Sequence, residues 1–559
     1  MVIIIFLFLI FVFCRPVLAY TDPLAVPNNR FGIHILEPED IDSAAALVNS
    51  QGGDWGYVTL IIRQNDRNLD KWQSVFDHLR RKHLIPIVRL ATYPEKNYWV
   101  KPDPNDVSNW VEFLNSLNWV VQNRYLILFN EPNHALEWGN DISPQEYVNI
   151  VKLFYEKLTQ SSPDYFILPA GFDTAAPNSS TTMAASTYWQ KMYQADPEVF
   201  RLFAGWNSHS YPNPDFSGLP TATGLGTIKS YLSELNYLSR FGLNPSLPVF
   251  VTETGWTHKD GNILGESDPP GEALSRFYQQ AFTQIWIEPN LVAVTPFILN
   301  YAQPPFNQFS WQKPGSKEFY PHYYAIQSVP KISGRPKQLH SSQLVKFTLP
   351  QTLIDSSSYE FALFFKNTGQ SIWEPNRFNL SVSGNFPDEL IQINQIETTE
   401  PNQTLEIKFK LFTPEQKTSF LLGFQLVADN QKFGEKFEQV LDIVPPPNLM
   451  AKVKHWFNRP ARGSGYRLLV YDETNQLITE FKLRFQNGLS QSISLYNLIP
   501  GSLYRFVLLK PYYLPRQVII RLQAESNEVI FPPLIKLDFN LDQKFSFKDL
   551  FYFWRWFTT

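Results

Sequence analysis

Short apolar runs alternate with amphipathic segments over roughly the first 330 residues of the chain. Residues 70–83 are one of the amphipathic segments, because the apolar residues Trp72, Val75, Phe76 and Leu79 recur at helical spacing. We expect strands at residues 30–35, 57–63, 86–90, 125–130, 165–171, 202–208, 247–252 and 292–300. We expect helices at residues 40–49, 70–83, 104–118, 143–158, 182–195, 226–240, 271–288 and 320–327.

Eight strand–helix units within about 300 residues predict a closed (β/α)8 TIM barrel over residues 28–335. After this region the pattern changes to alternating strands with turn residues between them. It predicts one β-sandwich at residues 341–444 and a second at 449–532, joined by the stiff linker Pro445-Pro446-Pro447. A short tail at 537–559 ends in an aromatic segment that we expect to be helical.

Composition narrows the possible partners and the compartment. Charged residues make up 18% of the chain and its formal net charge is −4, so a nucleic-acid partner is not expected. Val2–Phe13 is a run of twelve apolar residues, and Ala19 offers a cleavage position, so residues 1–19 are predicted to be a signal peptide. An uncleaved membrane anchor is the alternative. Cleavage would remove Cys14, the single cysteine, and would exclude disulfides and thiol catalysis.

Two glutamates follow apolar strands inside the predicted barrel. Glu131 stands in Asn130-Glu131-Pro132 after the fourth strand, and Glu253 stands in Thr252-Glu253-Thr254-Gly255-Trp256 after the seventh. Acids at the carboxyl ends of barrel strands lie where such proteins form their active sites. A pair of carboxylates can cleave a glycosidic bond, one by donating a proton and the other by attacking or by activating water.

These two motifs resemble the paired signatures of clan A glycoside hydrolases, especially the cellulase-like family 5 and the xylosidase-like family 39. The resemblance covers about 300 residues. It implies a retaining double displacement in which Glu131 is the acid/base and Glu253 is the nucleophile. It also implies that Asn130 binds the sugar 2-hydroxyl, and that His209 and Tyr211 lie near the nucleophile.

Other residues complete the expected site. We expect the Tyr211 hydroxyl to keep Glu253 ionised, while burial and the second negative charge keep Glu131 protonated. Arg63 is a candidate partner for Glu253, with Arg89 as its rival. Trp311 is a candidate sugar platform, Trp99 and Trp256 are lesser ones, and His34 on the first strand is a further candidate.

The appendages resemble known β-modules. Lys366–Trp373 is similar to a hairpin of an Ig-like domain, and residues 466–504 resemble a carboxypeptidase-regulatory-like sandwich. Either module could bind carbohydrate or act as a spacer, and we expect the spacer role.

A possible Ca²⁺ loop lies near the end of the chain. Its candidate oxygen ligands are at loop positions 1, 3, 5, 7, 9 and 12, with the seventh supplied by a carbonyl: Asp538, Asn540, Asp542, Lys544, Ser546 and Asp549. The segment resembles half of a dockerin repeat, which implies cohesin-like docking or a cell-surface partner. Gln543 replaces the usual glycine and no second loop exists, and a solvated acidic turn is the alternative.

Together these features predict an exported, monomeric, retaining hydrolase of O-glycosidic bonds that needs no catalytic cofactor. A glycan-binding protein without catalytic activity and a transglycosylase are the alternatives. The sequence does not identify the glycan or its linkage.

Overall fold

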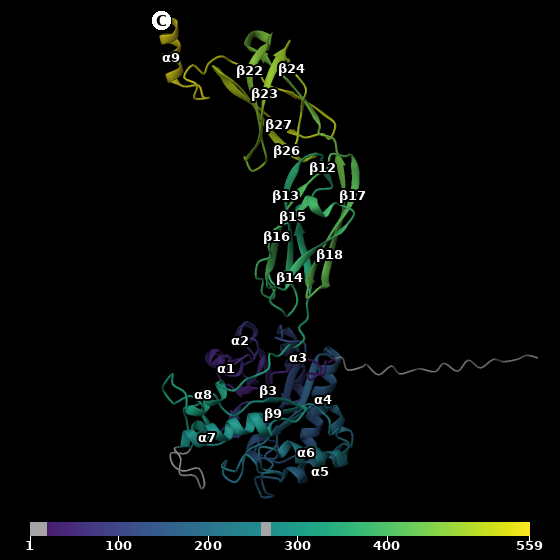
Figure 1. The fold of residues 1–559 in the computed structure, drawn as a ribbon, viewed down its shortest axis with the longest axis vertical. Helices are drawn as coiled ribbons and strands as arrows, with labels where there is room; N and C mark the ends of the chain where they lie inside the picture. Colours follow the sequence, from purple (N-terminus) through teal and green to yellow (C-terminus); the bar gives the residue numbers. More distant parts are fainter. Residues whose placement is uncertain (1–19, 259–269, 559) are drawn as a thin grey trace, which may run out of the picture. The chain divides into compact units, whose positions relative to one another are not determined.

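The computed structural model describes residues 20–258 and 270–558, which fall into two compact units (Figure 1). The first unit extends to Leu339 and includes Gln370–Ile372, and the second comprises His340–Gly369 and Trp373–Thr559. The predicted signal peptide at residues 1–19 lies outside the described residues. None of the helices in the described ranges has the length and apolar character needed to cross a bilayer.

Eight parallel strands of the first unit form two sheets. The larger sheet has the order β1-β2-β3-β6-β7, and the smaller has the order β10-β9-β8. Their bounds are β1 Gly32–His34, β2 Gly56–Arg63, β3 Leu84–Ala91, β6 Arg124–Leu128, β7 Tyr165–Pro169, β8 Trp206–His209, β9 Val249–Glu253 and β10 Leu291–Val294.

The prediction of a single closed (β/α)8 barrel is therefore wrong. The paired strands are divided into a five-stranded and a three-stranded sheet, and the larger sheets elsewhere in the chain are mostly antiparallel. Where the two parallel sheets meet, the described residues form isolated bridges, Phe31 with Val294 and Asp173 with His209, and scattered backbone hydrogen bonds, not a continuous strand ladder. Several of the strands there are only three or four residues long, which leaves little backbone to pair.

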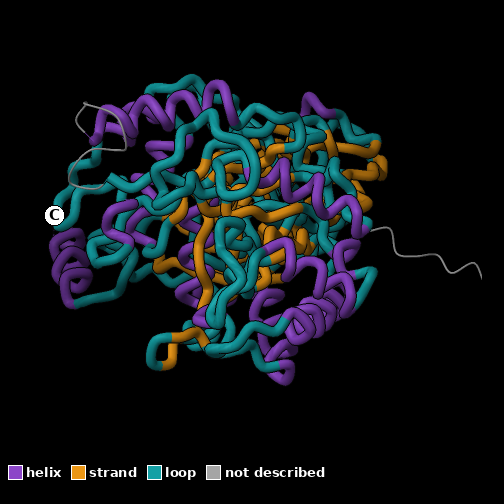
Figure 2. Tube along the Cα trace, turned by 90° about the horizontal axis from the view of Figure 1, so that it is seen from below, coloured by secondary structure: helices purple, strands orange, loops and turns teal. Residues whose placement is uncertain are grey.

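Helices follow most of these strands and lie on the outer side of the unit (Figures 1 and 2). The Asn68 side chain accepts a hydrogen bond from the Lys71 amide at the start of α2, and Trp72 and Phe76 bury its apolar face. The helices are α1 Ile41–Val48, α2 Leu69–Arg81, α3 Val107–Ser116, α4 Pro144–Ser161, α5 Ala185–Ala195, α6 Ser230–Leu238, α7 Pro270–Gln280 and α8 Pro321–Gln327. A small hairpin, β4 Pro94–Glu95 and β5 Tyr98–Trp99, follows β3.

Aromatic rings join the two parallel sheets in the core. Phe250 of β9 contacts Tyr125 of β6 and Phe166 of β7, with ring centroids 5.3 and 5.6 Å apart. Tyr57 of β2 contacts the same phenylalanine at 6.5 Å. All four side chains are buried, so burial of apolar surface holds β9 against the larger sheet.

The second unit begins with two four-stranded sheets that share one apolar core. Trp373 is fully buried in it. One sheet has the order β11 Ser342–Phe347, β13 Ser358–Asn367, β16 Thr404–Phe412 and β15 Ile391–Ile393. The other has the order β12 Thr352–Ile354, β18 Gln431–Val444, β17 Thr418–Ala428 and β14 Phe378–Gly384.

The second predicted sandwich is one eight-stranded sheet, which corrects the expectation of two facing sheets. Alternation of apolar residues indicates strands, but it does not specify which strands pair. The sheet comprises β19 Asn448–Lys452, β22 Gly463–Tyr471, β23 Leu477–Gln486, β24 Leu489–Ser490, β25 Ile493–Ser494, β26 Leu503–Lys510, β27 Tyr513–Arg521 and β28 Ser526–Ile530. A short pair, β20 Lys454–His455 and β21 Arg459–Pro460, accompanies it, and α9 Phe547–Thr558 ends the unit.

Candidate active site

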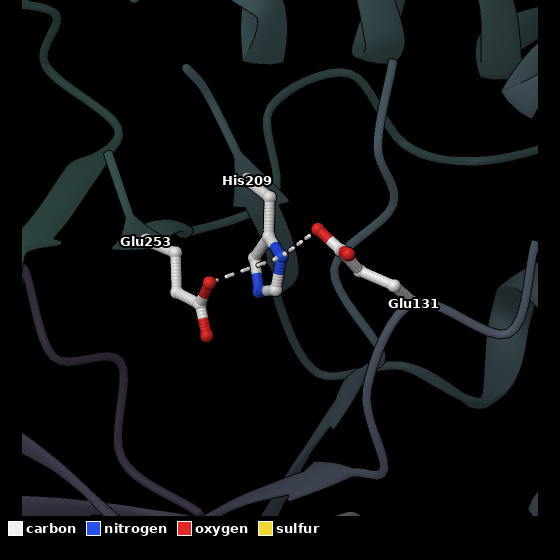
Figure 3. A group of neighbouring side chains, drawn as sticks. All are labelled: Glu131, His209 and Glu253. Atoms are coloured by element: carbon white, nitrogen blue, oxygen red, sulfur yellow. Dashed lines mark hydrogen bonds and ion pairs between the residues drawn. The ribbon is translucent and has the colours of Figure 1, made fainter. Parts of the chain in front are cut away.

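The two predicted glutamates lie close together in the first unit. Glu253 is the last residue of β9, and Glu131 follows β6 by three residues. One carboxylate oxygen of each, together with a ring nitrogen of His209, forms a group in which all atoms lie within 4.8 Å of one another. Figure 3 shows the imidazole of His209 between the two carboxylates. Side chains from both parallel sheets thus meet at one site.

Glu253 is held by cationic and hydrogen-bonding groups. An Arg89 Nη1 atom lies 2.5 Å from its Oε1, and the Tyr211 hydroxyl donates to its Oε2 at 3.2 Å. Burial raises the pKa of Glu253, but the nearby charges of His209 and Arg89 and the tyrosine hydrogen bond outweigh it and lower the pKa to about 2. Glu253 is therefore an ionised carboxylate at neutral pH.

His209 contacts both acids. Its Nδ1 lies 2.8 Å from Glu131 Oε1 and 3.7 Å from Glu253 Oε2. Burial lowers the pKa of His209, but the charge of Glu253 and the contact with Glu131 outweigh it, and the net shift is upward. A proton at Nδ1 is thus favoured beside Glu131.

A glycine makes room for this imidazole. A Cβ atom placed on Gly171 would lie only 2.0 Å from Cδ2 of His209. The side chain of His209 is 1% exposed, so it has little space to move away. Gly171, two residues beyond the end of β7, therefore fixes where the ring stands.

The segment that carries Glu131 has an unusual backbone. Phe129 has φ of 72° and Glu131 has φ of 23°, and neither is glycine. Positive φ values strain L-residues and persist only where surrounding contacts enforce them, often at functional sites. Asn130, between them, accepts a hydrogen bond from Arg89 Nη1 at 2.5 Å. Arg89 thus contacts this segment and Glu253 with the same atom.

The acids face a cavity of about 400 Å³, a size typical of small-ligand pockets. Phe297 contacts Phe306 and Phe309 edge-to-face and forms an aromatic wall. Trp99 and Arg63 also line the cavity. Such a combination of ring faces and polar groups suits a ligand with apolar faces and hydroxyl edges.

The predicted neighbours are only partly brought together. Asn130 and Tyr211 line the cavity, and His209 lies behind it. Arg89 makes the ion pair for which Arg63 was a candidate, and the Arg63 guanidinium lies 5.8 Å over the ring of Trp99 instead.

The other two predicted contributors do not face the ligand space. Trp311 is fully buried against Tyr278 and His322, so it is no sugar platform. His34 is also fully buried, and burial lowers its pKa to about 3, which leaves it neutral. Of the lesser candidates, Trp99 lines the cavity and Trp256 is 2% exposed in the core. Trp311, His34 and Trp256 are buried in the core instead, because large rings pack readily behind short strands.

Sequence reasoning missed several polar residues of the cavity. His134 and Asp173 pair at 2.9 Å on its wall, and Glu137 lines it as well. Burial raises the pKa of Glu137, with the charge of Glu131 adding to the shift. The one sequence signal that could have indicated two of them was proximity along the chain, since His134 and Glu137 follow Glu131 by only three and six residues.

Glu131, His209 and Glu253 offer three atoms of the kind that ligate metals. The Arg89 guanidinium, however, already places a fixed positive charge 2.5 Å from Glu253. This arrangement does not fit a divalent cation, so we assign no metal to the site. The six residues of the predicted Ca²⁺ loop lie in the second unit, five of them between β28 and α9 and Asp549 in the first turn of α9.

Comparisons with known proteins do not identify a family for this chain. No protein-family model matches it, and a search of the curated proteins found no match. Among solved structures, the Bacillus anthracis TIE protein is 10% identical, with 39% of this chain and 44% of that chain covered and a TM-score of 0.15. Domains D2 and D3 of the Corynebacterium diphtheriae major pilin SpaD are 9% identical, with 35% and 99% covered and a TM-score of 0.16. At these identities and TM-scores, neither likeness assigns a fold or a function to this chain.

Replacing Arg89 with methionine tests the buried ion pair. Arg89 and Glu253 side chains are 11% and 10% exposed, and removing one member of a buried pair costs about 3–5 kcal/mol. We expect Arg89→Met to lower the free energy of unfolding of the first unit by that order at pH 7. Arg63→Met, which removes a cavity arginine stacked on Trp99, should cost about 1 kcal/mol or less.

The difference should also depend on pH. The folded pKa of Glu253 is about 2, below its ordinary 4.5, so its ion pair stabilises the wild type above 4.5 and this contribution is lost as pH falls toward 2. Urea unfolding at pH 7 and pH 4 should therefore show a smaller gap between wild type and Arg89→Met at pH 4. A gap that is constant with pH would contradict this assignment.

Proposed function

We propose that the first unit is a retaining glycoside hydrolase that cleaves O-glycosidic bonds of an oligosaccharide or polysaccharide. The observation that supports this most is the approach of two carboxylate oxygens, from Glu131 and Glu253, to within 4.8 Å beside a cavity. Retaining enzymes place their carboxyl groups about 5–5.5 Å apart, whereas inverting enzymes leave roughly 6.5–9.5 Å for a water. The short separation favours retention.

In the first step, the ionised Glu253 attacks the anomeric carbon and Glu131 donates its proton to the departing glycosidic oxygen. One C–O bond forms as the other breaks, and a glycosyl ester of Glu253 results. The proton-bearing Nδ1 of His209, 2.8 Å from Glu131, allows the two side chains to share the proton that this step consumes.

In the second step, Glu131, now a carboxylate, removes a proton from water as the water attacks the same carbon. The ester bond to Glu253 breaks, the sugar leaves with its original anomeric configuration, and both glutamates return to their starting states. A sugar hydroxyl in place of water would give transglycosylation by the same residues.

Arg89 is the main positioning residue in this scheme. It helps to keep Glu253 charged and fixes the amide oxygen of Asn130. The Asn130 amide nitrogen donates one hydrogen to Glu137 and has a second for a substrate hydroxyl. The Tyr211 hydroxyl, whose pKa burial raises well above its ordinary value, stays protonated and donates to Glu253.

We further propose that the protein is exported and acts as a monomer on an extracellular glycan. The apolar run Val2–Phe13 supports the export step, and the β-rich second unit suits a spacer. The same run could instead remain as an anchor at the cell surface.

A substrate screen tests the proposed activity. Residues 20–559 should release sugar from at least one member of a panel of aryl β-glycosides and polysaccharides, while Glu131→Gln/Glu253→Gln should release none. Analysis of the products by chromatography separates hydrolysis from chain lengthening. If the wild type released no sugar from any member of the panel but still bound glycan, this would contradict the hydrolase activity and favour a glycan-binding role.

The loss of rate in Glu131→Ala should depend on the leaving group of the substrate. Without the acid, turnover of natural glycosides should fall by about 10²–10⁴-fold, whereas substrates with activated aryl leaving groups should lose far less in the first step. Glu198→Gln, at an exposed acid paired with Arg201, should leave both unchanged. Equal losses on the two substrate types would overturn the acid assignment.

Glu253→Gly should abolish hydrolysis but leave a pocket for glycosyl fluorides of inverted anomeric configuration. Because Glu131 is intact, it can still activate an acceptor hydroxyl, so these fluorides should be transferred to sugar acceptors. The measurement is fluoride release with an acceptor present. Hydrolysis of ordinary substrates by Glu253→Gly at the wild-type rate would contradict the nucleophile role.

A further inference from the structure

The segment before α9 and the first turn of α9 bring three carboxylates close together. One oxygen each of Asp538, Asp542 and Asp549 lies within 4.8 Å of the others. Asp538 is 3% exposed and Asp549 is fully buried. Like charges held so closely repel one another unless a cation or a proton compensates them.

One oxygen of this cluster lacks any partner. Asp538 Oδ1 is buried and has no hydrogen-bond partner, whereas its Oδ2 accepts from the Gln543 amide at 3.1 Å. A buried acceptor without a partner costs on the order of 1–3 kcal/mol, so this oxygen is free to bind a cation.

The other oxygens are oriented by the loop itself. Asp549 Oδ1 accepts from the amides of Phe539 and Asn540, and its Oδ2 accepts from the amide of Ser546 at 2.7 Å. Asp542 Oδ1 accepts from the Lys544 amide at 3.0 Å. Such amide contacts hold carboxylates in place while leaving lone pairs for an ion.

The backbone makes the turn that a glycine would make. Gln543 stands at the sixth loop position and has φ of 67°, in the left-handed region. The absence of glycine therefore does not prevent the sharp turn, although it adds strain on the order of 1–2 kcal/mol. A left-handed residue at the sixth position is what the sharp turn of a twelve-residue oxygen loop needs.

We propose that residues 538–549 bind one Ca²⁺ ion and that this ion fixes the start of α9. Three carboxylates, the side chains of Asn540 and Ser546 and the Lys544 carbonyl supply hard oxygen donors, which suit Ca²⁺. The proposal is independent of the glycosidase activity, because the loop lies in the second unit.

The loop also links the helix to the preceding sheet. The Asp538 amide donates to the Tyr512 carbonyl in the β26–β27 turn, and Phe539 packs on Phe553 of α9 with ring centroids 4.8 Å apart. Asp549 itself lies in the first turn of α9. An ion shared by Asp538 and Asp549 would therefore hold this helix to the loop.

Calorimetric titration of chelator-treated residues 20–559 with CaCl₂ tests the site. We expect one ion per chain with a dissociation constant below about 1 mM, and weaker binding of Mg²⁺, which demands a smaller octahedral site. Asp538→Asn/Asp542→Asn should weaken Ca²⁺ binding by on the order of 100-fold, since ligand charge sets affinity. Glu473→Gln, at an exposed acid in the same unit, should bind as the wild type does.

Hydrogen exchange gives a second reading in the same samples. Adding Ca²⁺ should slow the hydrogen exchange of α9 amides in the wild type. It should do the same in Gln543→Gly, which removes the left-handed strain, but it should not slow exchange in Asp538→Asn/Asp542→Asn. Circular dichroism of each variant verifies that the sheets remain folded. Absence of binding heat and of any exchange change in the wild type, or equal Ca²⁺ affinity in the folded double variant, would overturn the proposal.

Discussion

The buried ion pair between Arg89 and Glu253 is the interaction on which the candidate site depends. It joins β3, the middle strand of the five-stranded sheet, to β9, the middle strand of the three-stranded sheet. The charges of His209 and Arg89 together outweigh burial and lower the pKa of this carboxyl. The same guanidinium thus connects the two sheets and helps to keep Glu253 charged.

The remaining features follow from that constraint. Arg89 also holds Asn130, and therefore the strained segment from Phe129 to Glu131, against the cavity. His209 then lies between two acids in different surroundings, one ionised and one in contact with a proton-bearing nitrogen. Pairs of acids whose environments differ in this way can divide a reaction into proton transfer and nucleophilic attack.

The sequence predicted some parts of this arrangement well because they depend on local chemistry. Glu131 and Glu253 follow apolar strands, and strand ends gather polar side chains at one edge, so their proximity could be predicted. The sequence could not decide between Arg89 and Arg63 as the partner of Glu253, because both lie near the carboxyl ends of neighbouring strands and only packing decides which one reaches Glu253. The sequence left Trp311 undecided between a sugar platform and a packing role, because periodicity does not tell a buried ring from one that lines a cavity. The closed barrel was wrong because apolar patterns do not reveal which strand edges pair.

The nucleophile role proposed for Glu253 requires a covalent bond between its carboxylate and the sugar. Incubation of residues 20–559 with a panel of 2-deoxy-2-fluoro glycosides that carry good leaving groups, followed by mass spectrometry of the digested protein, tests it directly. We expect one added glycosyl group on the wild-type peptide that contains Glu253, and no added group on that peptide in Glu253→Gln. A label on another residue, or turnover of the parent glycosides without any trapped ester, would contradict it.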